Sequence, residues 1–364
     1  TFRLVDPLLG ISWETQGAEM RLLNNEAGFR WNGQIGLASH QGGDSGIVEE
    51  GGSVRWNLTI PPYARAAGAE TLLPAEALLT VTLERLEPSL VLELLPTLAE
   101  VVEWNGAVSG TLSAAFAPQS LPENVEYDLT VGGGLLTLPG LDRHLGFDSA
   151  SAAGQLRLGD RSLEVDEFVI SHAGNFARLR GFGALHGADQ ARVQVAASGL
   201  NLAWLSTIVP GAETLGGADI GVFADIDAMV RRGGGVDHAA IFLRTDPGQL
   251  ALPGVLPEPL AVGTSTMSLQ VANQGRDIHL QRLDISLPRS ADQAALPISI
   301  TGSASKGGEG RLNIVAGELD IADLKRLWPI GVGEGARVWI VDQVHAGLVP
   351  EVEGEIRFRL PDAT

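Results

Sequence analysis

The chain has 364 residues, and its 44 acidic side chains against 25 basic ones give a formal net charge of −19. This charge argues against nucleic acid as a partner, because a phosphate backbone is bound by clustered cations. Apolar side chains make up 45% of the chain and 46 residues are Gly, so the protein is acidic and yet unusually apolar. Its length allows two or three domains, or one large all-β unit.

The sequence contains no run of ~18 uncharged apolar residues and no signal-peptide pattern, so we expect the segment to be soluble. It begins at Thr1 and stops at Thr364 just after a strand-like run, and we interpret it as a piece of a longer chain. A membrane anchor would then lie outside it. The absence of Cys excludes a disulfide framework and a thiolate metal site and leaves the compartment open.

Apolar and polar residues alternate in many short runs, as at 54–60 and at 79–84. A period of two predicts strands with one apolar and one polar face. The apolar positions predicted to share the inner face are Val54, Trp56, Leu58, Ile60, Leu79, Val81, Leu83, Tyr127, Leu129, Val131, Val193, Val195, Met267, Leu269, Val271, Ile298, Ile300, Leu312, Ile314, Ile356 and Phe358.

Gly-rich segments separate these runs and predict hairpin turns at 51–52, 132–134, 159–160, 232–235 and 306–308. A parallel sheet would show near-continuous apolar strands and long amphipathic helices, which this chain lacks. The sequence therefore predicts a mostly β, elongated antiparallel fold with many hairpins in series.

Two short segments, 200–210 and 319–329, share a pattern of Leu, Asn or Asp, Leu or Ile, and Ala, and both close on an apolar pair and Pro. A weaker third copy lies at 86–96. Each copy predicts a short amphipathic helix with a polar cap at its start and Pro at its end. A further helix is predicted after Pro329, with Gly347 as its left-handed stop.

The near-even spacing of these copies predicts repeated units that add strands to one sheet. We place units at 1–105, 106–211 and 212–330, and the start of a further unit at 331–364, within one continuous β fragment. The Pro-rich segment 252–259 is the best candidate for a break between domains, and a loop is the preferred interpretation.

No pattern typical of an enzyme or a metal site stands out. The seven His have no pair three or four residues apart. Two small clusters, Asp142 with His144 and Asp148, and Asp219 with Asp225 and Asp227, are interpreted as solvated strand faces. The glycines at 331–335 are interpreted as a turn at the start of a helix. We therefore predict no cofactor, no metal and no catalytic residue.

Four of the seven Trp, at 56, 204, 328 and 339, lie on apolar faces of predicted elements. We expect them in the core. The alternative is that some of them line a cavity for an apolar ligand, because aromatic and aliphatic walls are typical of such sites.

The segment 324–347 combines a helix that ends in Trp-Pro, a Gly-rich turn, the residues Ala-Arg-Val-Trp, and a second helix before a strand. In this it resembles the central region of the YhdP-type proteins of the AsmA-like superfamily. The repeated Leu-Asn/Asp-Leu/Ile-Ala element is also similar to the strand–helix junctions of that superfamily. The resemblance extends over the whole chain but is specific only over 319–360, and the N-terminal membrane helix of the family is not present here.

This resemblance implies a periplasmic fragment of a Gram-negative bacterial protein that an absent N-terminal helix anchors to the inner membrane. It implies a long twisted antiparallel sheet, curled like a taco around a hydrophobic groove that conducts phospholipid toward the outer membrane. The apolar positions named above would line this groove, and contact with either membrane would be made through parts of the protein outside this sequence. A one-sided sheet with few helices also points this way, since it must close on itself or expose apolar surface.

Two alternatives remain open at this point. The first is an envelope assembly factor similar to the TamB branch, in which a sheet edge guides an outer-membrane β-protein. The second is an enzyme that acts on an envelope polysaccharide, because its paired carboxylates can be far apart in sequence.

Overall fold

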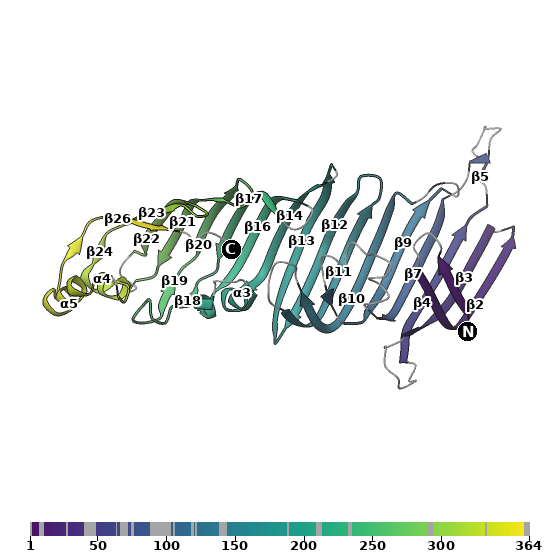
Figure 1. Cartoon of the computed structure of the whole chain (residues 1–364), viewed down its shortest axis with the longest axis horizontal. Coiled ribbons are helices and arrows are strands. Elements are labelled where there is room, and N and C mark those ends of the chain that lie inside the picture. Colours follow the sequence, from purple (N-terminus) through teal and green to yellow (C-terminus); the bar gives the residue numbers. More distant parts are fainter. Residues whose placement is uncertain are drawn as a thin grey trace. The chain divides into compact units, whose positions relative to one another are not determined.

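The computed structural model describes most of the chain. The described residues are 2–6, 11–26, 28–39, 49–62, 64–65, 72–73, 76–87, 103–104, 106–117, 120, 122–137, 144–187, 189–208, 213–231, 235–289, 294–331 and 333–359. Two compact units are present. Figure 1 labels their helices and strands. Unit 1 comprises Thr1–Gly174 with Arg180–Ala184, and unit 2 comprises Asn175–Leu179 with Leu185–Thr364, so that β13 (Asn175–His186) is divided between them.

Unit 1 is an antiparallel sheet in which consecutive long strands pair in the order in which they are named here. They are β1 (Phe2–Asp6), β2 (Ile11–Asn25), β3 (Gly28–Ser39), β4 (Glu49–Ile60), β7 (Ala77–Leu86), β9 (Val108–Phe116), β10 (Asn124–Thr137), β11 (His144–Arg157) and β12 (Ser162–His172). The short strands are β5 (Ala64–Arg65), β6 (Leu72–Leu73) and β8 (Glu103–Trp104).

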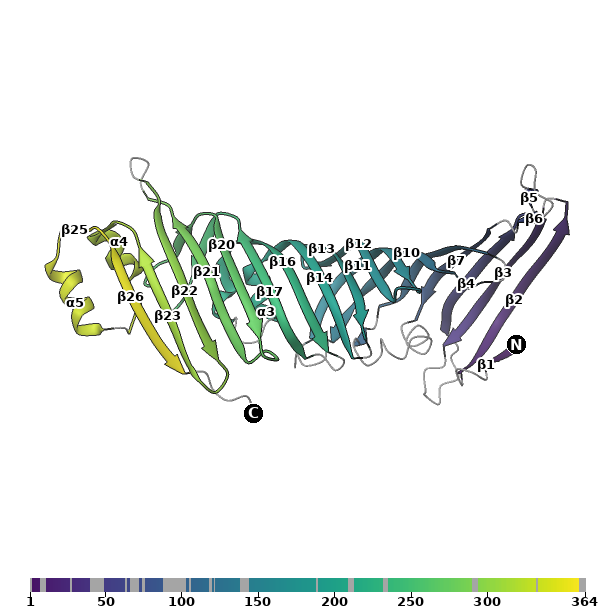
Figure 2. The same cartoon turned by 90° about the horizontal axis from the view of Figure 1, so that it is seen from above.

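Unit 2 contains a second run of antiparallel neighbours, which Figure 2 shows side by side. Its long strands, in pairing order, are β14 (Gln190–Asn201), β16 (Gly221–Arg231), β17 (Val236–Thr245), β20 (Ser265–Ala272), β21 (Asp277–Leu287), β22 (Leu296–Ser305), β23 (Glu309–Ala316) and β26 (Val352–Arg359). The prediction of a mostly β, antiparallel chain is confirmed.

Small elements form a second layer in unit 2. They are the sheet of β15 (Gly217–Asp219), β18 (Gly248–Ala251) and β19 (Leu260–Val262), the pair β24 (Leu319–Asp320) and β25 (Leu348–Val349), the 3₁₀ turn η1 (Glu213–Gly216), and the helices α3 (Leu202–Ile208), α4 (Ile321–Leu327) and α5 (Glu334–Gln343).

The helix prediction is confirmed at both strong copies of the repeated pattern. The side-chain oxygen of Asn201 accepts a hydrogen bond of 2.8 Å from the backbone N–H of Ala203. At the second copy the Asp320 carboxylate accepts a bond of 2.7 Å from the N–H of Asp323. The repeated Asn or Asp therefore caps the first turn, where the backbone N–H groups have no partner within the helix. Most of the third copy, 88–96, lies outside the described residues.

Some predictions of hairpin turns, and the prediction of the residue that ends α5, are wrong. Gly52 lies inside β4 with φ +101°, and the glycines at 132–134 lie inside β10. Both sites are places where a strand bends or a neighbouring backbone approaches, which Gly permits as readily as it permits a turn. Gly347 does not adopt a positive φ, and α5 ends earlier, with Val344 extended. Turns at 159–160 and 306–308, the loop at 252–259 and the start of α5 after Gly333 are confirmed.

The main core of unit 2 lies where the second layer packs against one end of the long strands. Leu287 of β21 and Leu296 of β22 are 1% and 0% exposed. They pack with residues of the small sheet, of β24 and of the segment just after β15, namely Ala218, Leu260, Val262, Leu319 and Ile220. We call this end of the strands the covered rim. The opposite end, which carries the hairpin turns at 272–277 and 305–309, is called the open rim.

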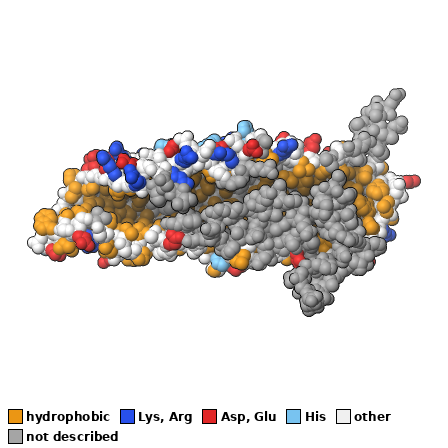
Figure 3. All heavy atoms as spheres, viewed as in Figure 1, with side chains coloured by type: hydrophobic (Ala, Val, Ile, Leu, Met, Phe, Trp, Pro, Cys, Tyr) orange, Lys and Arg blue, Asp and Glu red, His pale blue; other side chains and the backbone are white. Residues whose placement is uncertain are grey.

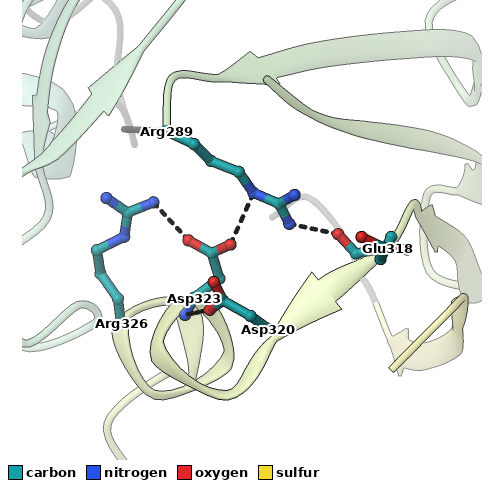
Figure 4. Close-up of polar contacts among 5 residues, drawn as sticks. All are labelled: Arg289, Glu318, Asp320, Asp323 and Arg326. Atoms are coloured by element: carbon teal, nitrogen blue, oxygen red, sulfur yellow. Dashed lines mark hydrogen bonds and ion pairs between the residues drawn. The ribbon is translucent and has the colours of Figure 1, made fainter. Parts of the chain in front are cut away.

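A buried ionic cluster fastens α4 to the covered rim (Figure 4). The Asp323 carboxylate lies 2.7 Å from Nε of Arg289, which follows β21, and 3.1 Å from Nη2 of Arg326. The Arg289 guanidinium also donates to the backbone carbonyl of Glu318. Because the Arg289 and Asp323 side chains are each only 10% exposed, either charge would be costly to bury without the other.

Candidate functional site: an apolar sheet face

The strand registers of unit 2 place apolar residues opposite one another across all eight long strands. Directly opposed residues of antiparallel strands share a face. One such row runs through the middle of the sheet, and we call it the apolar row. It consists of Val195, Ile226, Ile241, Leu269, Leu280, Gly302, Leu312 and Ile356. Seven strand spacings make this row roughly 34 Å long.

Neighbouring rows have the same character, so the whole face is apolar. Ala224, Leu243 and Met267 are opposed on one side of the row, and Ala228, Ala239 and Val271 on the other. All the predicted inward residues of unit 2 lie on this face. They are Val193, Val195, Met267, Leu269, Val271, Ile298, Ile300, Leu312, Ile314, Ile356 and Phe358.

Strand irregularities do not invert the face. In β21 the residues opposed to β22 skip from Leu280 to Leu283, so Gln281 and Arg282 form a bulge. An extra residue at this point keeps both Leu280 and Leu283 on the apolar side, although their spacing of three would otherwise put them on opposite faces.

The second layer covers only part of this face. Leu287 and Leu296 at the covered rim are buried, whereas Ile278 near the open rim is 36% exposed and Ile356 on the last strand is 48% exposed. The side chains of the apolar row between them are half-buried rather than sealed. Over unit 2, Figure 3 shows hydrophobic side chains gathered along a hollowed band, with charged side chains on the edge above it.

The other face of the same strands is polar and carries ion pairs, one between β14 and β16 and one within β21. Arg192 and Asp227 are 2.7 Å apart, and Arg282 and Asp284 are 2.6 Å apart. Hydrogen bonds from Arg192 and Gln194 lower the pKa of Asp227 to about 2. The hydrogen bond from Arg282 likewise lowers the pKa of Asp284. This face therefore stays charged and hydrated.

The predicted residues of unit 1 also share one face. They are Val54, Trp56, Leu58, Ile60, Leu79, Val81, Leu83, Tyr127, Leu129 and Val131. Tyr127 donates a hydrogen bond of 2.9 Å to the carbonyl oxygen of Glu164, so its polar tip is satisfied. Burial, with a smaller contribution from Asp166, raises the pKa of Tyr127. Unit 1 thus presents its own continuous apolar face.

Aromatic rings lie over glycines on these faces, a feature that the sequence alone did not reveal. Trp56 is directly opposed to Gly33, and Phe358 to Gly310. Each ring occupies the space where a Cβ on the glycine would lie. Trp56 also meets Trp31 edge to face, with ring centroids 5.7 Å apart. Such pairs add apolar area where the glycine offers none.

Of the Trp residues predicted to lie in the core, one is confirmed there and one is not. Trp204 of α3 is 7% exposed and belongs to the core, as expected. Trp339 of α5 is 61% exposed, so its placement in the core is wrong. No residue of α5 is buried, and Val338 next to Trp339 is 55% exposed. The apolar spacing of α5 indicated a helix correctly but did not reveal that nothing in the described part of unit 2 covers it.

The described residues contain no group of three or more His, Asp or Glu that could hold a metal ion. Asp225 and Asp227 lie on the polar face of β16, and Asp142 lies outside the described residues. A cavity of about 580 Å³ near the open rim is lined by Asp227, Arg192, His186 and His238, among others. Within this cavity Arg192 and Asp227 form an ion pair of 2.7 Å.

No family model, curated protein or solved structure matches the chain. The resemblance to the AsmA-like superfamily therefore remains a prediction. In the described part of the chain, no helix has the length and apolar character needed to cross a bilayer. The candidate site rests on the geometry of the apolar faces alone.

Proposed function

We propose that the chain shields the acyl chains of phospholipid on its apolar sheet faces and conducts them between the inner and outer membranes of a Gram-negative cell. The single observation that carries this proposal is the apolar row of unit 2, which crosses eight strands and stays half-exposed along the side that the second layer leaves free. A soluble sheet that presents such a face to water would be unfavourable without an apolar ligand.

The energetics suit a lipid chain. Burial of one CH₂ contributes ~0.8 kcal/mol, so an acyl chain of ordinary length would gain on the order of 10 kcal/mol from a continuous apolar wall. Since equivalent side chains repeat from strand to strand along the row, a bound chain can move by one strand spacing and keep nearly the same contacts. Conduction on this wall requires no catalytic residue.

The two faces of each strand have different roles under this proposal. The apolar face contacts the lipid chain, and the polar face, with ion pairs such as Arg192 with Asp227, keeps the protein hydrated. We propose the periplasm as its location and phospholipid as its partner, with contacts to both membranes made elsewhere in the protein. Motivation for these details comes from the resemblance over 319–360.

Native mass spectrometry of the chain, expressed in a Gram-negative periplasm, tests this proposal. We expect co-purified phospholipid in the wild type and its loss in Leu269→Asp, which puts a charge in the apolar row. Ser268→Asp is the matched control, because it adds the same charge one residue away on the polar face, opposite Arg282. Leu129→Asp and Thr130→Asp form the same pair in unit 1.

Folding is checked by circular dichroism on all four variants. Equal lipid content in Leu269→Asp and Ser268→Asp, with both folded, would contradict the proposal. Lipid-free wild-type protein with a bound polypeptide would favour the assembly-factor alternative instead.

A further inference from the structure

Two cations lie opposite one another at the open rim of unit 2. Asp277 of β21 is paired with Ser305 of β22, and one step further in the same register Arg276 comes opposite Lys306. The backbone N–H of Lys306 donates a hydrogen bond of 2.8 Å to the carbonyl oxygen of Arg276, so the strand pairing continues through this step. Opposed residues share a face, and their Cα atoms lie only ~5.5 Å apart.

Both cations belong to the apolar side of the sheet. Ile278 and Ala304 are directly opposed on the apolar face. Because side chains alternate between the two faces of a strand, Arg276 shares the face of Ile278, and Lys306 shares that of Ala304. The cations therefore stand roughly 7 Å beyond the last apolar residues, where the apolar face meets water. Figure 3 shows Lys and Arg side chains along this edge of the hydrophobic band.

The acidic groups of the same two turns lie on the other side of the sheet. Asp277 belongs to the polar face, where its carboxylate accepts a hydrogen bond of 2.8 Å from Ser305 and another from Asn273. These hydrogen bonds lower the pKa of Asp277, and the charge of Arg276 makes a smaller contribution. Glu309 lies on the polar face as well. Neither of the two cations forms an ion pair with another described residue.

A second pair of opposed cations in unit 2 shows what such an arrangement requires. Arg311 and Arg357 are directly opposed on the polar face. The Glu355 carboxylate lies 3.7 Å from Nε of Arg311 and also forms an ion pair with Arg357. Like charges directly opposite each other destabilise a strand pair, and here a carboxylate compensates for them. The cations at the open rim have the same opposition without a described carboxylate partner, so an anion from outside the chain would stabilise them.

We propose that Arg276 and Lys306 bind the phosphate group of the phospholipid headgroup while the acyl chains lie on the apolar row. This inference rests on the proposed function and names the part of the lipid that the open rim contacts. A phosphodiester carries one negative charge and several acceptor oxygens, for which guanidinium and ammonium groups are the usual protein partners.

The dimensions of the sheet fit a lipid in this orientation. Leu280 of the apolar row lies four residues, or ~13 Å, from Arg276 along β21. That distance leaves space for the glycerol and ester groups over Ile278. At the opposite end of the strands, Leu287 and Leu296 are buried under the second layer. The open rim is therefore the end at which a polar headgroup can reach water.

Two lipids with identical acyl chains test this assignment. The probes are phosphatidylglycerol and the corresponding diacylglycerol, each with the same fluorescent label on one acyl chain, so that only the first has a phosphate. We expect the wild type to bind phosphatidylglycerol roughly tenfold or more tightly than diacylglycerol. The double variant Arg276→Gln with Lys306→Gln should lose this preference and bind diacylglycerol within about twofold of wild type.

The matched control removes the same two charges from the opposed pair on the polar face. Arg311→Gln with Arg357→Gln should keep the preference for phosphatidylglycerol. A second variant, Lys306→Glu, puts a carboxylate opposite Arg276, as Glu355 does for its own pair. It should lose the preference and unfold no earlier than wild type on heating without lipid. A lower unfolding temperature would contradict the claim that the two cations are uncompensated.

The outcomes separate this proposal from the proposed function. Equal affinity of the wild type for the two lipids, or an equal preference in the wild type and the folded double variant, overturns the headgroup assignment while lipid binding itself stands. Failure of the wild type to bind either lipid overturns both. Inorganic phosphate is titrated calorimetrically into the same proteins. Phosphate binding without lipid binding, lost in the double variant, would assign a site for free phosphate and overturn the headgroup assignment.

Discussion

The covered rim and the apolar row of unit 2 are built from the same residue types on the same sheet face, and they differ in what lies over them. At the covered rim, the small sheet and α4 bury Leu287 and Leu296 almost completely. In the row, Leu269 and Leu280 are half-buried. The strand pattern is identical in both places, so the pattern alone does not decide which apolar residues form core and which remain available to a ligand.

Under the proposed function, this difference gives one sheet face two separate uses. Burial at the covered rim stabilises the fold, since full burial of a Leu side chain contributes about 1.5–3 kcal/mol. The half-buried residues of the apolar row contribute less to stability, and part of their apolar surface stays accessible. Substitutions at the two places should therefore have opposite profiles, with large effects on stability at the rim and large effects on lipid binding in the row.

The largest expected effect comes from breaking the ionic cluster that holds α4 on the covered rim. Asp323→Asn would leave Arg289 and Arg326 without their carboxylate, at a cost of about 3–5 kcal/mol in the free energy of unfolding. Urea unfolding measures this cost. Increased binding of a hydrophobic dye should accompany it, because α4 would no longer be held on the rim. Asp342→Asn on the exposed helix α5 is the control and should change little.

A core truncation compares the two places directly. Leu296→Ala should lower the free energy of unfolding by about 2–5 kcal/mol, because the residue is fully buried. Ile241→Ala in the apolar row should cost roughly half as much or less, since its side chain is only half-buried. Equal losses in the two variants would show that the row is sealed in solution and would contradict the distinction.

Glycines under aromatic rings offer a finer test. Gly310→Ala would push a methyl group into the Phe358 ring, and we expect a loss of about 1–3 kcal/mol in the free energy of unfolding. Gly354→Ala on the neighbouring strand has open space and should stay within about 0.5 kcal/mol of wild type. Thermal unfolding of the two variants and the wild type checks these outcomes.

The smallest effect concerns the polar face. The pKa of Asp227 is lowered to about 2 in the folded protein from 3.8, so its ion pair stabilises the fold above about pH 4. That contribution is lost as the pH falls toward 2, because protonation ends the pairing with Arg192. The stability difference between wild type and Asp227→Asn should therefore be present at pH 6 and vanish near pH 2. Solvent exposure keeps this difference small.

Much of this arrangement could be predicted from the sequence. The period of two put Val195, Leu269 and Ile356 on one strand face, and the registers confirm it. The capping Asn201 and Asp320 were visible as a repeated pattern. These features depend on local spacing, which a sequence shows directly.

Other features depend on long-range contacts that spacing does not encode. The pairing of Arg289 with Asp323 joins segments 34 positions apart through a buried ion pair. The glycines at 132–134 were predicted as a turn but lie within β10, because a glycine permits a bend in a strand as readily as a reversal. Exposure of Trp339 could not be read from a helical spacing that is equally typical of a core residue.

Site-specific photocross-linking in a Gram-negative periplasm tests the central claim most directly. A photoreactive residue is placed at 241, 269 or 280 in the apolar row and, in separate variants, at the neighbouring polar-face positions 240, 268 and 279. We expect phospholipid adducts at the three row positions and none at the three neighbours. Adducts at both sets, or at neither, would contradict the assignment of the apolar face as the surface that carries lipid.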